Sequence, residues 1–198
     1  MKKFIFILAI LIILAAAGFM FFGAGPTIDD YKNLIEPRLI TLPDKKMIIV
    51  ELRGKPGDIA GKGIGMLYKT IYKLDKKDRV DRNAAPAARW PKSTEVKQEE
   101  WVGIFALPVK DSLVALPQGS PAEVKIGTWK YGEVAEILHV GRYDKEVPTV
   151  EKLKKFIADK GYAISGDHEE EYVKGPGWIF KGDPEKYLTI IRYQVKKK

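Results

Sequence analysis

The residues with the clearest capacity for chemistry are consecutive: His168, Glu169, Glu170, Glu171 and Tyr172. Side chains on a β-strand alternate between its two faces, so His168, Glu170 and Tyr172 would share one side of a sheet. A carboxylate among apolar and aromatic side chains is poorly solvated, and a lipophilic cation would supply its missing counter-charge. The alternation thus places Glu170 on the same face as His168 and Tyr172, while a register shift of one residue would place Glu169 and Glu171 there instead.

Other chemistries are less well supported by the sequence. Only His168 and Glu170 can converge on one strand face, and two protein ligands make a poor metal site, so we predict no metal. The glycine-rich residues 61–65 lack the spacing of a dinucleotide fingerprint, and we predict no cofactor. Cysteine is absent, which excludes disulfides and thiol nucleophiles. We expect His139, at the end of a predicted strand, to orient the following turn.

A strand, a helix and a second strand are predicted to position the polar stretch. Residues 133–140 are rich in apolar and β-compatible side chains, and residues 141–144 interrupt them. Pro148 can begin a helix because the first turn needs no N–H from it. Gly161 can end that helix in a left-handed conformation. One face of the helix would carry Val150, Leu153, Phe156 and Ile157.

The first half of the chain contains a similar series of elements. Residues 44–53 predict a strand, and Asp58 is a candidate cap for the helix that follows. Residues 75–94 are expected to form a loop that contains Trp90, and residues 96–110 a later strand. A short strand at 124–129 then begins the second half. The helical spacing in the first half is carried by Ile64, Leu67, Tyr68 and Ile71.

These two series predict an α+β fold of duplicated β-α-β-β repeats. The repeats would cover about residues 37–110 and 122–196, with the proline- and glycine-bearing residues 111–121 between them. Each repeat has one sheet face to cover, so the two should pack with pseudo-two-fold symmetry. That geometry predicts a groove between the repeats, and such grooves are preferred ligand sites.

The first 25 residues have a different character. Lys2 and Lys3 precede an uncharged, almost wholly apolar run over 4–24. As a helix this run would span roughly 30 Å, enough to cross a bilayer. We expect a transmembrane helix within 1–25, a linker over 26–36 and a ligand-binding domain over 37–198, with a cytoplasmic N-terminus and an extracytoplasmic domain. The alternative is a cleaved signal peptide and a secreted domain.

The formal net charge of +8 raises the question of a nucleic-acid partner. The lysines are scattered among acids, and the sequence contains no recognition-helix pattern or compact basic arm, so no nucleic-acid partner is predicted. The charge fits solubility and attraction to lipid headgroups beside the predicted anchor. The oligomeric state stays open.

Several of these residues in combination resemble the GyrI-like small-molecule-binding family, which also supplies effector-binding domains of bacterial transcription regulators. The resemblance is carried by residues 139–143 (HVGRY), the helix after them, Glu170 with Tyr172, and residues 189–193 (TIIRY). It implies a duplicated β-α-β-β fold with a ligand groove and a carboxylate at the start of an E-x-Y strand, here Glu170. The family usually has an apolar residue between Glu and Tyr, whereas this chain has Glu171.

The resemblance leads to three functional hypotheses. The leading one is a membrane-anchored domain that binds small amphipathic molecules, cationic or aromatic, around Glu170. The second is a hydrolase of reactive cyclopropane-containing compounds, with Glu170 as general base and Tyr172 or Tyr143 as hydrogen-bond donor. The third is a protein-interaction or inhibitor module without a small ligand. The aromatic residues predicted to line the groove are Tyr68, Trp101, Phe105, Trp129, Tyr143, Tyr172 and Trp178, with Trp90 a further candidate.

Overall fold

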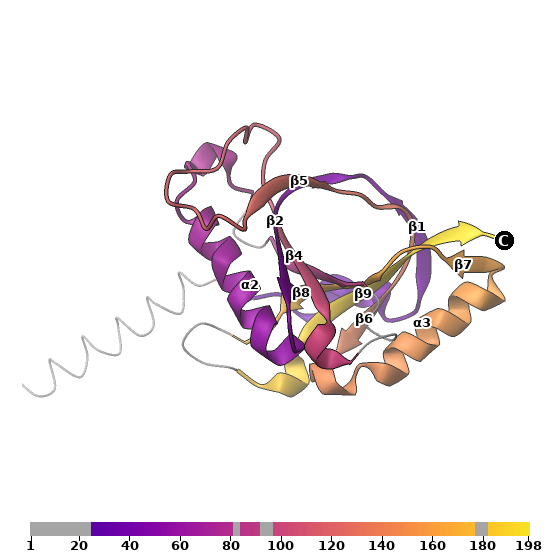
Figure 1. Ribbon diagram of the computed structural model, residues 1–198. Coiled ribbons are helices and arrows are strands. Elements are labelled where there is room, and N and C mark those ends of the chain that lie inside the picture. The colour runs from indigo at the N-terminus through magenta and orange to yellow at the C-terminus, as the bar shows by residue number, and fades with distance from the viewer. Residues whose placement is uncertain (1–24, 81–83, 92–96, 177–181) are drawn as a thin grey trace, which may run out of the picture.

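The computed structural model describes residues 25–80, 84–91, 97–176 and 182–198 (Figure 1). The predicted anchor over 1–24 and the predicted groove residue Trp178 lie outside the described residues. Among the helices that are described, none combines the length and the hydropathy needed to cross a bilayer.

A curled antiparallel sheet dominates the fold (Figure 1). The main strands run in the order β1-β6-β9-β8-β3-β4-β2-β5, and the short β7 pairs with β9 beside this path. Their bounds are β1 (Arg38–Leu42), β2 (Lys45–Arg53), β3 (Ala87–Trp90), β4 (Val102–Pro108), β5 (Lys125–Trp129), β6 (Gly132–Val140), β7 (Tyr162–Ile164), β8 (His168–Lys174) and β9 (Leu188–Lys197).

The strand order has an internal symmetry. Each strand of the first half has a counterpart in the second: β1 corresponds to β5, β2 to β6, β3 to β8 and β4 to β9. If every strand is replaced by its counterpart, the same strand order is obtained, read from the other edge of the sheet. The symmetry centre lies between β3 and β8, which pair with each other. The first strand of each half pairs with the other half, β1 on β6 and β5 on β2. The predicted α+β class is confirmed. Each half has the main elements β-β-α-β-β, one strand more than the predicted β-α-β-β repeat, because β1 and β5 come first.

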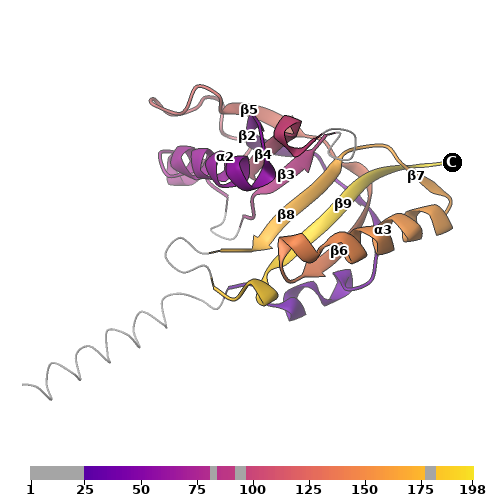
Figure 2. The same ribbon diagram turned by 60° about the horizontal axis from the view of Figure 1, so that its bottom comes forward.

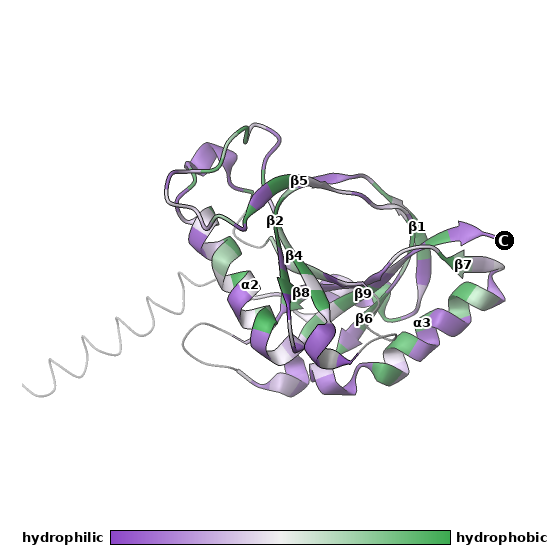
Figure 3. Cartoon of the chain, viewed as in Figure 1, coloured by the Kyte–Doolittle hydropathy of each residue, from purple (hydrophilic) through white to green (hydrophobic). Residues whose placement is uncertain are grey.

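Two amphipathic helices pack on the outer face of the curled sheet, α2 (Pro56–Ile71) over β2 and β4 and α3 (Val147–Asp159) over β6 (Figures 1 and 2). Figure 3 shows hydrophobic and hydrophilic residues following one another in turn along both helices. The predicted apolar face of α3 is confirmed by the burial of Val150, Leu153 and Ile157. The short 3₁₀ helices are η1 (Ile28–Leu34), η2 (Lys76–Asp78), η3 (Gln98–Glu100), η4 (Tyr143–Lys145) and η5 (Pro184–Lys186).

The helix ends follow the predicted residues in the second half and depart from them in the first. Pro148 lies in the first turn of α3, and Gly161 follows the helix with a φ of +78°. Asp58, however, is not the cap of α2. The helix begins at Pro56 after Lys55, which makes no side-chain capping bond. Proline can begin a helix by itself because its fixed φ suits the first turn.

Strand β3 lies where the sequence predicted a loop. Its residues are Ala87, Ala88, Arg89 and Trp90. Alanine and arginine have weak strand preferences, and the β-branched residues that mark other strands are missing here. Pairing with β4 on one side and β8 on the other places this segment at the middle of the sheet. Its conformation therefore comes from its partners rather than from its own composition.

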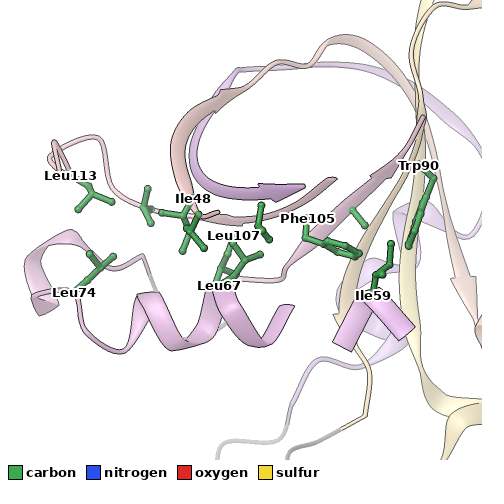
Figure 4. Packing of buried hydrophobic residues seen from close by; sticks show 12 residues of the cluster. Ile48, Ile59, Leu67, Leu74, Trp90, Phe105, Leu107 and Leu113 are labelled. Carbon is green, nitrogen blue, oxygen red and sulfur yellow. The ribbon is translucent and has the colours of Figure 1, made fainter. Parts of the chain in front are cut away.

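The largest group of buried residues fills the space between α2 and strands β2 and β4 (Figure 4). Ile48, Leu67 and Leu107 pack together there, and none is more than 2% exposed. The ring of Phe105 is fully buried and occupies the space beside Gly63 of α2 and Gly103 of β4. Glycine is required at both positions, because a Cβ atom at either would collide with this ring.

Two glycines of α2 should respond oppositely to alanine. Gly63→Ala should destabilise the domain by about 1–3 kcal/mol, because its Cβ atom would collide with Phe105. Gly61→Ala should instead stabilise it by about 0.5–1 kcal/mol, because open space surrounds that position and alanine has the higher helix propensity. Urea denaturation of both variants measures the two changes. A stabilising Gly63→Ala would show that α2 does not pack this closely on β4.

Candidate functional site

A cluster of two carboxylates and a histidine lies where the two halves meet. His168 and Glu170 project from the same face of β8, and Glu146 approaches them from the start of α3. His168 Nε2 lies 3.2 Å from Glu170 Oε1 and 3.7 Å from Glu146 Oε1. We call Glu146, His168 and Glu170 the carboxylate–histidine cluster.

The histidine of the cluster has a defined orientation. Its Nδ1 is hydrogen-bonded to the hydroxyl group of Tyr193 at 2.9 Å, which leaves Nε2 facing the carboxylates. Both Nε2 of His168 and Oε2 of Glu146 are buried and make no hydrogen bond within the described structure. Glu170 is only 8% exposed. Buried polar atoms normally have partners, so these two atoms indicate a site that something else completes.

Burial, together with a neighbouring carboxylate, raises the pKa of Glu146 to about 7. Burial is the main cause, the charge of Glu170 adds to it, and His168 acts in the opposite direction. Two neighbouring carboxylates in a poorly solvated place resist ionising together. The cluster therefore holds a proton, or needs a cation, near neutral pH.

Aromatic rings lie beside the cluster, where Tyr193 bonds to His168 and Tyr172 to Glu170. Tyr143 packs edge-on against Tyr172 with 5.6 Å between ring centroids, and against Tyr187 at 5.4 Å. Trp90 pairs in register with His168 across β3 and β8, and its ring lies 5.8 Å from that of Trp101. These five residues, together with Tyr193, form the aromatic shell of the cluster.

Two contacts fix the tyrosines of the aromatic shell. Burial, the charge of Glu170 and a hydrogen bond to Glu170 together raise the pKa of Tyr172 well above its usual value. A Cβ atom at Gly175 would lie 2.6 Å from the hydroxyl oxygen of Tyr143, so glycine leaves room for that hydroxyl group. Tyr172 thus acts as a neutral donor to the carboxylate.

The other two acids of residues 168–172, Glu169 and Glu171, face the opposite side of the sheet. Arg192 on β9 donates from Nη1 to Glu169 at 3.2 Å and to Glu171 at 2.5 Å, and from Nε to Glu136 at 2.6 Å. Arg89 donates to Glu169 at 2.8 Å. Burial alone would lower the pKa of Arg192, but the three carboxylates together raise it. The register of β8 thus places Glu170, and neither neighbour, in the cluster.

The structure separates the predicted aromatic residues into groups. Tyr143, Tyr172 and Trp101 belong to the aromatic shell. Phe105 lies in the core beneath α2. Tyr68 of α2 stacks on Tyr72 at the end of that helix, with 6.1 Å between the ring centroids. Trp129 lies on the opposite face of the sheet from Glu170, where its indole N–H donates to Glu169 at 3.0 Å.

Sequence reasoning missed Glu146, Tyr187 and Tyr193. Glu146 stands two residues before Pro148, and acids are common at helix starts, so its position carried no special signal. His139 behaves as predicted: its ring nitrogens contact Thr149 Oγ1 at 3.0 Å and the carbonyl oxygen of Arg142 at 2.9 Å, which fixes the turn after β6.

Two cavities among the described residues lie away from the cluster. One, of about 610 Å³, is lined by Lys45, Lys110 and Glu171 among others. The second, of about 420 Å³, is lined by Tyr68, Tyr72 and Arg79 among others. Neither of these two cavities is lined by a member of the cluster. A ligand that binds Glu170 therefore needs space that neither cavity provides.

Comparison with known proteins gives the family of the chain. The model of a family described as GyrI-like small molecule binding domain matches residues 35–195. This chain belongs to that family. The GyrI-like domain accordingly has a small-molecule-binding fold, and the predicted resemblance is confirmed. The comparison with curated proteins found no match.

Solved structures share the fold of this GyrI-like domain. An uncharacterised conserved protein from Listeria innocua is 22% identical with a TM-score of 0.68, and the match covers 82% of this chain and 93% of that one. A hydrolase from the same organism is 18% identical with a TM-score of 0.68, covering 87% and 100%. The C-terminal domain of EcmrR is 16% identical with a TM-score of 0.67, covering 82% and 98%. At these identities the likeness concerns the fold.

Proposed function

We propose that the GyrI-like domain binds a small amphipathic cation at the carboxylate–histidine cluster. The observation that supports this is a charge imbalance between the two faces of the sheet. On one face Glu136, Glu169 and Glu171 are paired with arginines. On the other face no lysine or arginine among the described residues pairs with Glu146 or Glu170. A ligand cation would supply what the domain itself does not.

The aromatic shell suits the apolar part of such a ligand. Rings of Tyr143, Tyr172 and Trp90 lie around the carboxylates, and a cation over an aromatic face gains about 0.5–2 kcal/mol. Displacing one or two rings would open a space with carboxylates at its base and aromatic walls. Flat or aromatic organic cations would fit a space with such walls.

Calorimetric titration with tetraphenylphosphonium tests the proposal. The full-length chain is used in a non-ionic detergent that keeps the apolar residues 4–24 in solution. Glu170→Gln should weaken binding about tenfold or more, because it removes the better buried carboxylate. Glu123→Gln, an exposed acid on a loop, is the matched control and should bind as the parent does. Equal affinity of the parent and Glu170→Gln would contradict the electrostatic part of the proposal.

A hydrolytic function is the second candidate. A carboxyl group with a pKa of about 7, such as Glu146, is suited to general acid–base chemistry near neutral pH. Glu146 or Glu170 would take a proton from water, and Tyr172 would donate a hydrogen bond to the reacting group. Time-dependent loss of a cyclopropane-containing electrophile that disappears in Glu170→Ala would support it. Stoichiometric binding without turnover would count against it.

We also infer that residues 1–25 hold the domain outside the cytoplasm at a membrane. The support is the apolar run over 4–24 behind Lys2 and Lys3. After expression in bacteria, the full-length chain should resist extraction from membranes by alkaline carbonate, whereas a chain without residues 2–24 should be soluble. Release of an N-terminally shortened protein into the periplasm or medium would instead indicate a cleaved signal peptide.

A further inference from the structure

We propose that Glu146, His168 and Glu170 also form a binding site for a divalent transition-metal ion, with Zn²⁺ as the expected occupant. The proposal goes beyond organic-cation binding because it assigns His168 a role as a ligand through Nε2. It also predicts an ion of defined coordination where the proposed function requires only positive charge.

The separations of the donor atoms fit one ion. Zinc binds nitrogen and oxygen at about 2.0–2.2 Å, so two donors on a tetrahedral ion stand about 3.3–3.6 Å apart. His168 Nε2 lies 3.2 Å from Glu170 Oε1 and 3.7 Å from Glu146 Oε1. One donor atom from each of the three residues lies within 4.8 Å of the others. The two distances from Nε2 are within a few tenths of an ångström of this spacing, and the two carboxylate oxygens would have to approach each other by up to about 1.5 Å to share the ion.

The unpaired atoms of the cluster are the second observation that points to an ion. Nε2 of His168 and Oε2 of Glu146 are buried, and within the described residues neither makes a hydrogen bond. Nε2 faces two carboxylates, an arrangement that calls for a proton or a cation between the groups. A metal ion would bind Nε2 of His168 directly, and it would also satisfy Oε2 of Glu146 if that carboxylate bound through both oxygens or turned about its last bond.

The surroundings of His168 match those of a metal-ligating histidine. Such a histidine usually gives its other ring nitrogen to a fixed partner, which sets the tautomer and the orientation of the ring. Here Nδ1 contacts the hydroxyl group of Tyr193 at 2.9 Å. Tyr193 is thus a positioning residue, since it would act on the ion only through His168.

The ligand set indicates which ions fit. One imidazole and two carboxylates suit borderline and moderately hard divalent ions such as Zn²⁺ and Mn²⁺, and of these two Zn²⁺ generally binds a given site more tightly. Three protein ligands leave a fourth tetrahedral position for water or a donor atom of a bound molecule. Catalytic rather than structural zinc sites have this open position.

Titration of ZnCl₂ into chelator-treated full-length chain, in the same non-ionic detergent, tests the proposal. The parent should bind one ion per chain, and His168→Gln should weaken binding about a hundredfold or more. His139→Gln is the matched control, because the chain has two histidines and His139 already contacts Thr149 and Arg142. That variant should retain binding. Tyr193→Phe should weaken binding by about tenfold through loss of its contact with Nδ1.

The outcomes separate this proposal from the organic-cation proposal. His168→Gln leaves both carboxylates, so it should lose Zn²⁺ and keep tetraphenylphosphonium, whereas Glu170→Gln should weaken both. If His168→Gln does not fold, Tyr193→Phe serves in its place, because it also leaves both carboxylates and should weaken only Zn²⁺ binding. The metal proposal is overturned if the parent binds no stoichiometric Zn²⁺, or if removing His168 or Glu146 leaves the affinity unchanged. Tetraphenylphosphonium binding by the parent would stand in either case.

Discussion

Arg192→Gln should destabilise the domain by about 3–5 kcal/mol, the usual cost of removing one partner from a buried ion pair. Arg192 is 6% exposed, and it is the common partner of Glu136, Glu169 and Glu171. Once it is removed, these carboxylates share a poorly solvated space with less compensating charge. A neutral glutamine can donate to one of them and cannot offset their repulsion.

The remaining arginines would not compensate for this loss. Arg38 still pairs with Glu136 and Arg89 with Glu169, but Glu171 has no other arginine or lysine partner among the described residues. Urea denaturation measures the change. Arg142→Gln is the matched control: its pair with Asp144 is solvent-exposed, so its loss should cost about 1 kcal/mol or less. Similar stabilities for the two variants would show that the network around Arg192 does not support the fold.

The ligand-free domain should lose stability as the pH rises from 5 to 8, by up to about 3 kcal/mol. The pKa of Glu146 is raised from 4.5 to about 7 in the folded protein, chiefly by burial and then by Glu170. A raised pKa means that the folded state favours the neutral carboxyl group. The resulting stability is fully present below the unfolded pKa and disappears as the pH rises through about 7.

A bound cation should remove this loss, and its affinity should increase over the same pH interval. The groups that face Glu146 are Glu170 and His168 from β8 and Tyr193 from β9. Thermal unfolding at several pH values, with and without tetraphenylphosphonium, measures both effects. Glu146→Gln is the control and should show a flatter profile, since its side chain does not titrate. A parent profile identical to that of Glu146→Gln would contradict the prediction.

Periodicity and helix-end residues predicted most of the fold. The strand that became β6, the helix that became α3 and its ends at Pro148 and Gly161 are all encoded locally. Strand β3 could not be predicted in this way, because Ala87 to Trp90 become a strand only when β4 and β8 flank them. Local composition specifies elements that carry their own pattern, whereas a central strand can take its conformation from its neighbours.

The candidate site shows the same division. Alternation along one strand correctly placed His168, Glu170 and Tyr172 on one face. Glu146 lies at the start of α3, which precedes β8 in the chain, and it reaches Glu170 only through tertiary packing, so alternation along one strand could not include it. Arg192, a single charge within the apolar residues 188–193, did carry a signal. A charge in such a strand requires a buried partner, and Glu169 and Glu171 were available on a neighbouring strand.

The exchange of first strands between the two halves affects how the chain folds. β1 pairs with β6, so Arg38 meets Glu136 across 98 residues of sequence, and β5 in turn completes the sheet of the first half. In each half, the backbone hydrogen bonds of one strand edge are completed by a strand of the other half. We therefore expect the two halves to fold in one cooperative transition, and pairing between residues so distant in sequence should slow it. If the chain were cut within residues 111–121, the two fragments would be unstable alone and should regain the native sheet when mixed.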